Sequence, residues 1–386
     1  MSIERVAVTL DDTDHAARAL ELLDAALAKD PTSIECNYNK SLWLLSSGRF
    51  VEGWPQWEWR LKLKTAKAGY DWFPVPQWKL GDDLAGKHVF VWMEQGVGDQ
   101  ILTSSMIPDL CAVAGSVTIH CYARLVPLFR RSFPKAIICK LGEPKPERMK
   151  TWAFDYQMSV SDLGLAFRKT FEDFPKHNGF LKADPKLVAE IRKRYGASDD
   201  FLLTGLSWRS TNYMIGGGKS MKLANIGHIL TASNVKFVNL QYGDVADEIA
   251  EAKQRFGVDI INDPEIDQLI NMDDFAAQVA AMDQVISTSN TCLHLAGALG
   301  VPTNGFIPRG ASRIWYWFAE RTDSPWYPSV ELMRQRAPGA PSNSRLALNI
   351  PISEHRFGNL PFEKGYSPEG TMNMPSRDAQ AEFCNV

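Results

Sequence analysis

The chain has little that would mark it as secreted, membrane-spanning or nucleic-acid-binding. No segment approaches about 18 uninterrupted apolar residues, and the first residues lack the basic start and apolar run of a signal peptide. The formal net charge of -3 does not indicate the excess positive charge with which proteins bind nucleic acid or an anionic membrane. The 6 cysteines are scattered, without a C-x-x-C pair or zinc-like spacing to histidine, which indicates reduced thiols. We therefore expect a cytoplasmic protein without a transmembrane segment or a nucleic-acid partner.

Several catalytic motifs are also missing. There is no G-x-S-x-G elbow and no P-loop lysine after glycines in the required order. The loop "EQGVGDQ" is not a dinucleotide fingerprint, because Ile101 stands where the third glycine belongs and the later acidic residue is absent. An NAD-dependent oxidoreductase is thus disfavoured. Asp12 and Asp14 form a D-x-D pair, but it precedes an expected helix, which favours a capping role over a metal site. We expect no metal and no cofactor.

The first 66 residues are helical in pattern. Apolar residues recur at helical spacing over 14–30, Pro31 breaks the run, and a second helix reaches about Ser47 before Gly48. A tryptophan-rich helix follows over 51–64. Helix, proline turn, helix, glycine and helix are typical of a tetratricopeptide unit, and one to one and a half units fit here. Such a fragment cannot bury its own faces, so it should pack on the rest of the chain.

The remainder alternates between strand-like and helix-like runs. After a proline- and glycine-rich linker over 67–86, the strands are expected at 88–92, 116–122, 136–141, 154–160, 201–208, 235–241, 259–262, 283–288 and 302–307. Helices are expected between them at 101–114, 124–133, 185–196, 223–233, 245–257, 272–282 and 292–300. This pattern predicts an α/β fold of two Rossmann-like domains facing a cleft. We place the boundaries at 1–66 (helical), 67–190, 191–335 and 336–386, the last an extended or disordered tail.

The most informative segment is the strand, loop and helix from Lys87 to Leu110. Its loop carries Gly96, Gly98 and Asp99 at the carboxyl end of a strand, where parallel sheets place their ligands. The glycines would let the backbone approach a ligand closely. Asp99 is equally explained as a helix cap or as a general base.

Two further polar segments follow strands of the second half. In "VISTSNTCLHLAGALG", hydroxyl and amide groups beside a helix N-terminus suit a diphosphate, and His294 would point to the same ligand, although an ordinary capped helix explains them too. In "GLSWRSTNYMIGGGKS", Arg209 and a glycine segment ending in Lys219 favour a mobile phosphate contact and a disordered surface loop equally.

Several blocks together resemble bacterial tetratricopeptide-containing glycosyltransferases, related to heptosyltransferases and more distantly to O-linked N-acetylglucosamine transferase. They are "GRFVEGWPQWEWRL", "PQWKLGDDLAGKHVFVWMEQGVGDQI", "KFVNLQYGD", "DDFAAQVAAMDQVIST", "HLAGALGVPT" and "SPWYPSVELMRQ", in the family's order over roughly residues 15–335. The resemblance implies a GT-B architecture, a metal-independent inverting transfer and a nucleotide-sugar co-substrate. It implies that the C-terminal domain binds the donor and the N-terminal domain binds a protein or glycan acceptor.

The resemblance also implies roles for single residues. Asp99 matches the proposed base, with Glu94, Gln95, Gly96 and Gly98 as the acceptor-side loop. It places Lys219, Thr291 and His294 beside the donor phosphates, with Gln241 facing the cleft. From the polar segments themselves we add Ser207, Arg209, Ser289 and Asn290 as expected donor-binding residues. Asn290 stands where the family usually has aspartate, and the usual closing helix is replaced by a proline-rich tail. Asn290 and the short helical array favour the alternative of a catalytically weak or inactive nucleotide-sugar-binding protein, with a partner docked on its helical N-terminus.

Overall fold

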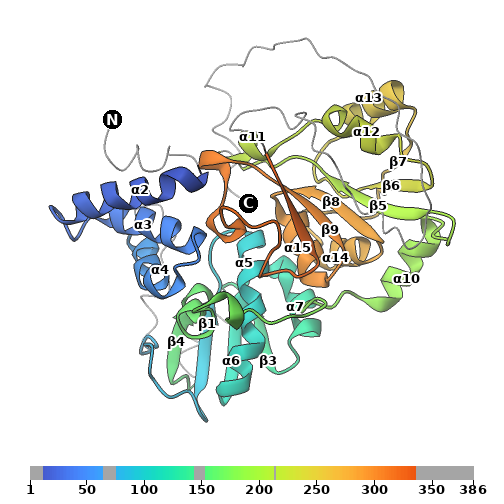
Figure 1. Ribbon diagram of the computed structural model, residues 1–386. Coiled ribbons are helices and arrows are strands. Elements are labelled where there is room, and N and C mark those ends of the chain that lie inside the picture. Colours follow the sequence, from blue (N-terminus) through green and yellow to red (C-terminus); the bar gives the residue numbers. More distant parts are fainter. Residues whose placement is uncertain (1–11, 64–74, 143–152, 213, 336–386) are drawn as a thin grey trace. The chain divides into compact units, whose positions relative to one another are not determined.

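Strands and helices alternate into two parallel sheets, one from each half of the chain, in the computed structural model (Figure 1). The structure describes residues 12–63, 75–142, 153–212 and 214–335. The expected tail after 335 and most of the expected linker's first half lie outside these residues, as do the side chains of Asp12 and Asp14. Among the described helices, none is long and apolar enough to span a bilayer. The predicted α/β class with parallel sheets is confirmed.

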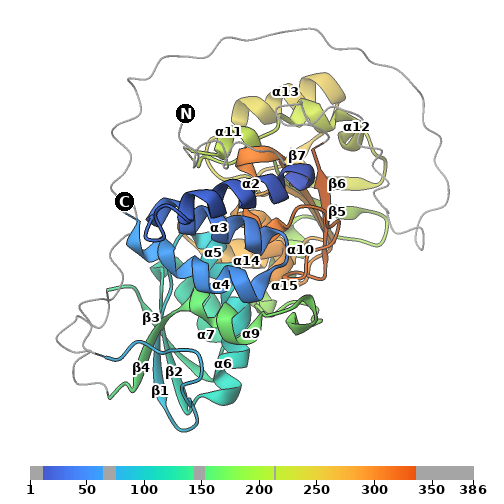
Figure 2. The ribbon, with the colours of Figure 1, turned by 60° about the vertical axis from the view of Figure 1, so that its left-hand side comes forward.

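The first three helices lie beside one another (Figure 2). They are α2 (Asp12–Leu27), α3 (Ile34–Ser46) and α4 (Phe50–Trp57), and a 3-10 helix, η1 (Glu58–Lys62), follows directly. Ser33 caps α3 through its hydroxyl, which accepts the Cys36 N–H. Gly48 has a φ of +74°, a conformation that favours glycine, and it ends α3 where the sequence predicts a stop. Their assignment as a tetratricopeptide unit stays a prediction.

The first sheet has the strand order β3-β2-β1-β4. Its strands are β1 (His88–Trp92), β2 (Ser116–Cys121), β3 (Ala136–Lys140) and β4 (Tyr156–Ser159), and all pairs are parallel. Helices between or after them are α5 (Val97–Thr103), η2 (Ser104–Met106), α6 (Ile107–Val113), η3 (Ala123–Leu125), α7 (Val126–Ser132), η4 (Val160–Leu163), α9 (Gly164–Phe167) and η5 (Phe171–Asp173). The single helix predicted over 101–114 is wrong in its bounds. It begins at Val97 and breaks at η2, because Pro108 in the first turn of α6 has no N–H to continue the ladder.

The second sheet has the order β10-β9-β8-β5-β6-β7, again with parallel pairs. Its strands are β5 (Leu202–Ser207), β6 (Val235–Asn239), β7 (Ile260–Ile261), β8 (Gln284–Thr288), β9 (Thr303–Ile307) and β10 (Val330–Arg334). Its helices are α10 (Pro185–Arg194), α11 (Gly216–Lys219), η6 (Leu223–Ile226), α12 (Gly227–Leu230), α13 (Ala246–Phe256), α14 (Met272–Ala280), α15 (Thr291–Leu299), η7 (Gly310–Ser312) and η8 (Trp315–Trp317). Strand β10 is absent from the sequence prediction, and the helix expected over 223–233 forms as two short ones.

The helical segment packs on the rest of the chain, as its pattern predicts. The indole of Trp54 donates to the Arg168 carbonyl at 2.7 Å and meets the Trp315 ring edge-on at 5.5 Å. Phe50 packs in the same way against Phe318, with ring centroids 5.9 Å apart. Aromatic contacts therefore join this segment to both halves of the α/β fold.

A buried ionic cluster strengthens this attachment. Arg60 of η1, only 4% exposed, forms ion pairs with Glu94, which follows β1, and with Asp162 of η4. Its guanidinium also donates to the Ser159 hydroxyl at 2.9 Å. Burial alone would raise the pKa of Glu94, but the Arg60 guanidinium outweighs this effect and lowers it. Arg60 and Glu94 are therefore both charged at neutral pH. Glu94, an expected acceptor-side residue, thus serves to fix the loop that carries Asp99.

Replacing Arg60 with methionine should destabilise the protein by about 3–5 kcal/mol, because two carboxylates would stay buried without their cation. Urea unfolding of the full chain measures this cost. Arg49→Met is the matched control, since Arg49 pairs with Glu52 on an exposed helix face. Equal midpoints for the two variants would contradict a structural role for the cluster.

Candidate functional site

Asp99 lies in the first turn of α5, at the carboxyl end of β1. Its Oδ2 accepts the Gly96 N–H at 3.0 Å, so the capping interaction that the sequence suggests is present. A carboxylate has further lone pairs, which remain available to another donor or to a proton. Capping and proton transfer are therefore compatible roles for Asp99.

Burial raises the pKa of Asp99 above the usual range of an aspartate. The Gly96 N–H and the nearby Lys219 ammonium oppose this rise without cancelling it. A carboxylate with a raised pKa is a better proton acceptor near neutral pH. The electrostatics of Asp99 thus suit a general base.

Lys219 comes from the other half of the chain and lies close enough to Asp99 to feel its charge. It ends α11, where Gly216 is buried and a side chain on Gly218 would collide with Ser312. Lys219 is only 8% exposed, and within the described residues its ammonium has neither a hydrogen bond nor an ion pair. Burial lowers its pKa to about 8, against the opposing effect of Asp99. The expected surface loop is therefore a packed turn that holds a cation without a bonded anion.

The backbone at Gly98 packs closely against another residue of the protein, His294. A Cβ added there would lie 2.7 Å from Cδ2 of His294, so α5 and α15 touch at this point. His294 is 3% exposed, and its Nδ1 lies 3.0 Å from the Tyr327 hydroxyl. Burial, aided by Lys219, lowers the pKa of His294 to about 3, so the ring is neutral. Packing against His294 therefore explains the lack of a side chain at Gly98, and the approach of its backbone to a ligand stays a prediction.

Three expected donor contacts form one internal network at the ends of β5, β6 and β8. Asn290 donates to the Ser207 hydroxyl at 2.7 Å, and its Oδ1 accepts the Cys292 and Leu293 N–H groups. Gln241 accepts the Trp208 N–H at 2.9 Å and a bond from Ser207. Asn290 is thus the N-cap of α15, and these side chains join three strands. The alternative of an ordinary capped helix holds for Asn290.

Asn290 should not be replaceable by aspartate without a loss of stability. Its amide also donates to the Arg209 carbonyl at 3.1 Å, where a carboxylate oxygen would face another acceptor. We expect Asn290→Asp to destabilise the protein by about 1–3 kcal/mol at neutral pH, with partial recovery at acidic pH as the carboxyl protonates. Thermal unfolding measures this change. The control Asn271→Asp alters the cap of α14, whose amide is exposed, and should cost much less.

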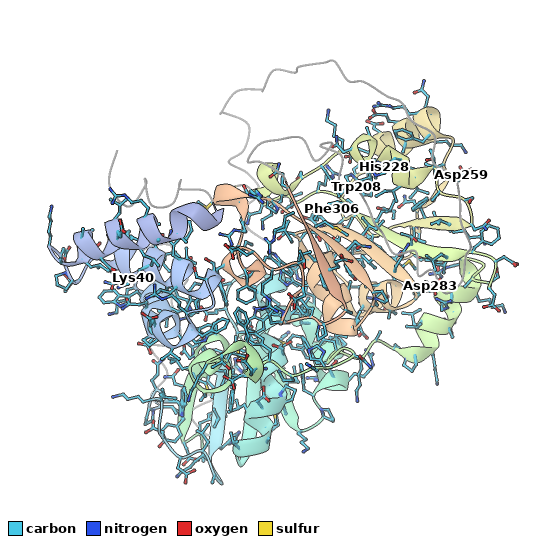
Figure 3. All side chains as sticks on the ribbon, in the orientation of Figure 1. Lys40, Trp208, His228, Asp259, Asp283 and Phe306 are labelled. Carbon is cyan, nitrogen blue, oxygen red and sulfur yellow. The ribbon has the colours of Figure 1, made fainter. Side chains whose placement is uncertain are left out.

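The other expected residues lie apart from Asp99 or bind protein groups. Arg209 pairs with Glu248, which also accepts the indole N–H of Trp208. Trp208, labelled in Figure 3, directly follows β5. Ser289 accepts the indole N–H of Trp317 at 2.8 Å. Thr291, the first residue of α15, is half-buried. Gln95 is exposed, with a φ of +62° and its carbonyl bound to the Tyr122 hydroxyl.

Sequence reasoning missed three tyrosines that approach Asp99. Tyr38 comes from α3, Tyr316 from η8 and Tyr327 from the segment before β10, and each feels the Asp99 charge. Burial raises the pKa of all three, so their hydroxyls stay protonated. The aromatic run "WYWF" is visible in the sequence, but no local pattern places it beside the Asp99 loop.

Within the described residues no group of metal ligands occurs at this site, and a small cavity lies elsewhere in the second half of the chain. The described residues contain no group of three or more His, Cys, Asp or Glu side chains that could hold a metal ion. A cavity of about 130 Å³ lies between η6 and α13, and none of the expected site residues lines it. Metal independence and an open cleft stay predictions.

Known proteins resemble this chain in sequence and in fold. No family model matches it. The chain is 35% identical over 302 residues to protein FlbA of Caulobacter vibrioides (strain ATCC 19089 / CIP 103742 / CB 15). The aligned region covers 74% of this chain and 50% of FlbA. It therefore spans about half the length of that curated relative.

The solved structures extend the comparison. A family 9 glycosyltransferase from Veillonella parvula matches with a TM-score of 0.50 and 12% identity, covering 66% of this chain and 89% of that one. This likeness establishes a shared fold. The ADP-heptose heptosyltransferase II of E. coli matches with a TM-score of 0.46 and 13% identity, over 64% of this chain and 90% of that one.

Proposed function

We propose that the protein is a metal-independent inverting glycosyltransferase of GT-B architecture. It would move a sugar from a nucleotide-sugar donor to a hydroxyl of a protein or glycan acceptor in the cytoplasm. The fold shared with a family 9 glycosyltransferase supports this reading, and so does the meeting of Asp99 with Lys219 from the other half of the chain. The helical N-terminus remains a proposed docking site for a protein partner.

In this reaction the acceptor oxygen attacks the anomeric carbon of the donor sugar. As the new C–O bond forms, Asp99 takes the acceptor proton. The bond from the anomeric carbon to the diphosphate breaks, and the nucleoside diphosphate leaves with the electron pair. Lys219 would neutralise the growing negative charge, and the Thr291 hydroxyl would bind a phosphate oxygen. His294 is neutral and would shape the site without adding charge.

One observation carries the proposal: Lys219 is a buried cation near Asp99, and its ammonium makes no hydrogen bond or ion pair within the described residues. Burying a charge without a bonded partner is costly, so such a lysine is rarely retained for stability alone. A diphosphate would supply the anion that this ammonium lacks. The adjacent base would then lie next to the sugar that the diphosphate carries.

Thermal-shift screening with UDP-, GDP-, ADP- and CMP-sugars tests the proposal, followed by a donor-turnover assay. We expect one nucleotide class to raise the unfolding temperature of the full chain and its sugar to be transferred or slowly hydrolysed. If none of the four classes stabilised the protein, the nucleotide-sugar reading would be lost.

A second candidate is a catalytically weak or inactive nucleotide-sugar-binding protein. It is favoured by Asn290, whose side chain already occupies the Cys292 and Leu293 N–H groups that a diphosphate would otherwise use. In that case a nucleotide sugar would stabilise the protein, but its sugar would be neither transferred nor hydrolysed.

A further inference from the structure

One peptide unit of the loop between β1 and α5 is held by both of its polar groups. This unit joins Gln95 to Gly96. Its carbonyl accepts the Tyr122 hydroxyl at 2.8 Å, and its N–H donates to Oδ2 of Asp99 at 3.0 Å. Because a peptide unit is planar, neither group can turn without the other. Tyr122 is therefore connected to Asp99 through a single rigid plane.

The backbone of this peptide unit is strained at Gln95. Its φ of +62° lies in the left-handed region, which residues other than glycine rarely adopt. Such a conformation persists only where surrounding contacts impose it. Arg60 holds the side chain of Glu94, one residue earlier. The Tyr122 hydroxyl, in contrast, bonds the Gln95 backbone itself and so directly opposes rotation of the strained unit.

Tyr122 is itself held in place, directly after β2. Its own N–H donates to Oε1 of Gln100, a residue of α5 that is only 1% exposed, at 3.1 Å. The Arg124 guanidinium lies 5.8 Å from the centre of the Tyr122 ring and donates to the Leu269 carbonyl at 2.7 Å. Leu269 belongs to the second half of the chain. The tyrosine therefore has fixed contacts to α5 and, through Arg124, to the other half.

We propose that Tyr122 is a positioning residue: its hydroxyl locks the peptide plane whose N–H holds the Asp99 carboxylate in the orientation that takes the acceptor proton. The inference rests on the proposed glycosyl transfer and adds a residue to it. Without the hydroxyl, Gln95 would relax towards a negative φ and the plane would rotate. The Gly96 N–H would then leave Asp99, and the carboxylate could turn away from the acceptor.

Nuclear magnetic resonance of this peptide unit in the full chain tests the proposal without a substrate. Gly96 follows a glutamine, and no other glycine of the sequence does. Carbon-13 in glutamine carbonyls and nitrogen-15 in glycine, introduced by cell-free synthesis, therefore mark the Gln95–Gly96 unit alone. Tyr122→Phe removes the hydroxyl and retains the half-buried ring. Exchange of the Gly96 N–H with solvent should become about 3- to 10-fold faster, the value of one hydrogen bond.

Tyr156→Phe is the matched control. Tyr156 begins β4 of the same sheet and pairs with Val89 near the start of β1, at the opposite end from the Asp99 loop. Its Gly96 exchange rate should equal that of the natural chain. Equal exchange rates in Tyr122→Phe and Tyr156→Phe would overturn the proposal.

Turnover in two backgrounds tests whether the lock acts through the backbone of residue 95. Tyr122→Phe alone should lower kcat about 3- to 10-fold, with little change in the donor KM. Glycine adopts a positive φ without strain, so in a Gln95→Gly background the same change should lower kcat less than about 2-fold. Alanine does not, so the full effect should persist in a Gln95→Ala background. Equal losses in the glycine and alanine backgrounds would contradict the lock, because a general structural role for Tyr122 predicts them.

Failure of the proposed transfer gives a different result. If the natural chain consumed no donor with any acceptor class, the transfer itself would be rejected. Faster Gly96 exchange in Tyr122→Phe would even then support the locked peptide plane, since that measurement needs no donor.

Discussion

Asp99→Asn should reduce kcat for sugar transfer by about 10²- to 10⁴-fold, the usual contribution of a general base. The amide cannot take the acceptor proton at any relevant pH. Its oxygen can still accept the Gly96 N–H, so the start of α5 should remain intact. Turnover is measured by donor consumption, and donor binding by calorimetry on the same preparation. Donor affinity should change little, since the carboxylate faces the acceptor in this mechanism.

Asp155→Asn is the matched control for this change. Asp155 also accepts a backbone N–H, from His88 at 2.8 Å, but it stands at the opposite end of β1 from Asp99. Its turnover should equal that of the natural chain. Full turnover by Asp99→Asn would remove Asp99 from the base role.

Lys219→Met should weaken binding of nucleoside diphosphates by about 10- to 100-fold, the value of a charge-assisted hydrogen bond to phosphate. The same change should increase the free energy of unfolding by about 1–3 kcal/mol at pH 7, because a buried cation without a bonded partner is replaced by an apolar side chain. Opposite changes in affinity and stability are typical of a residue retained for function. Lys222→Met is the control, since Lys222 is exposed nearby.

The pH dependence of binding follows from the same lysine. Because the pKa of Lys219 in the free protein is lowered to about 8, its charge is present below that pH and is lost above it. A bound anion favours the charged form, so affinity should be constant below pH 8 and weaken as the pH rises beyond it. Calorimetry above pH 8 should also detect proton uptake on binding. Proton uptake by Lys219→Met equal to that of the natural chain would contradict this assignment.

Much of the fold could be predicted because buried parallel strands appear in the sequence as short, mostly apolar runs. "HVFVW" and "VKFVN" are such runs, and both form strands at the predicted places. The strand "VELMR" is short, carries the charged residues Glu331 and Arg334, and follows a proline-containing segment, so it was not recognised. The local pattern also failed to show that the helix predicted over 101–114 is interrupted at Ser104–Met106. The interruption depends on Pro108, which lies in the first turn of a new helix, α6, directly after it.

The candidate site was less predictable, because hydrogen-bond partners depend on tertiary structure. The loop of Asp99 and the segment of Lys219 stand out locally, through glycines beside a charged residue. Ser207, Gln241 and Asn290 have the right chemistry for a diphosphate, but the fold brings them together and they bind one another. Tyr316 comes near enough to Asp99 to feel its charge only through tertiary structure, which no spacing in the sequence encodes.

The most direct test of inverting transfer is proton NMR of the reaction with the donor identified by thermal shift. The coupling constant of the anomeric proton reports the configuration of the sugar before and after transfer. Direct attack by an acceptor hydroxyl deprotonated by Asp99 predicts a product with the configuration opposite to that of the donor. A product that retains the donor configuration, or a donor that stays unconsumed with every acceptor class, would contradict the account.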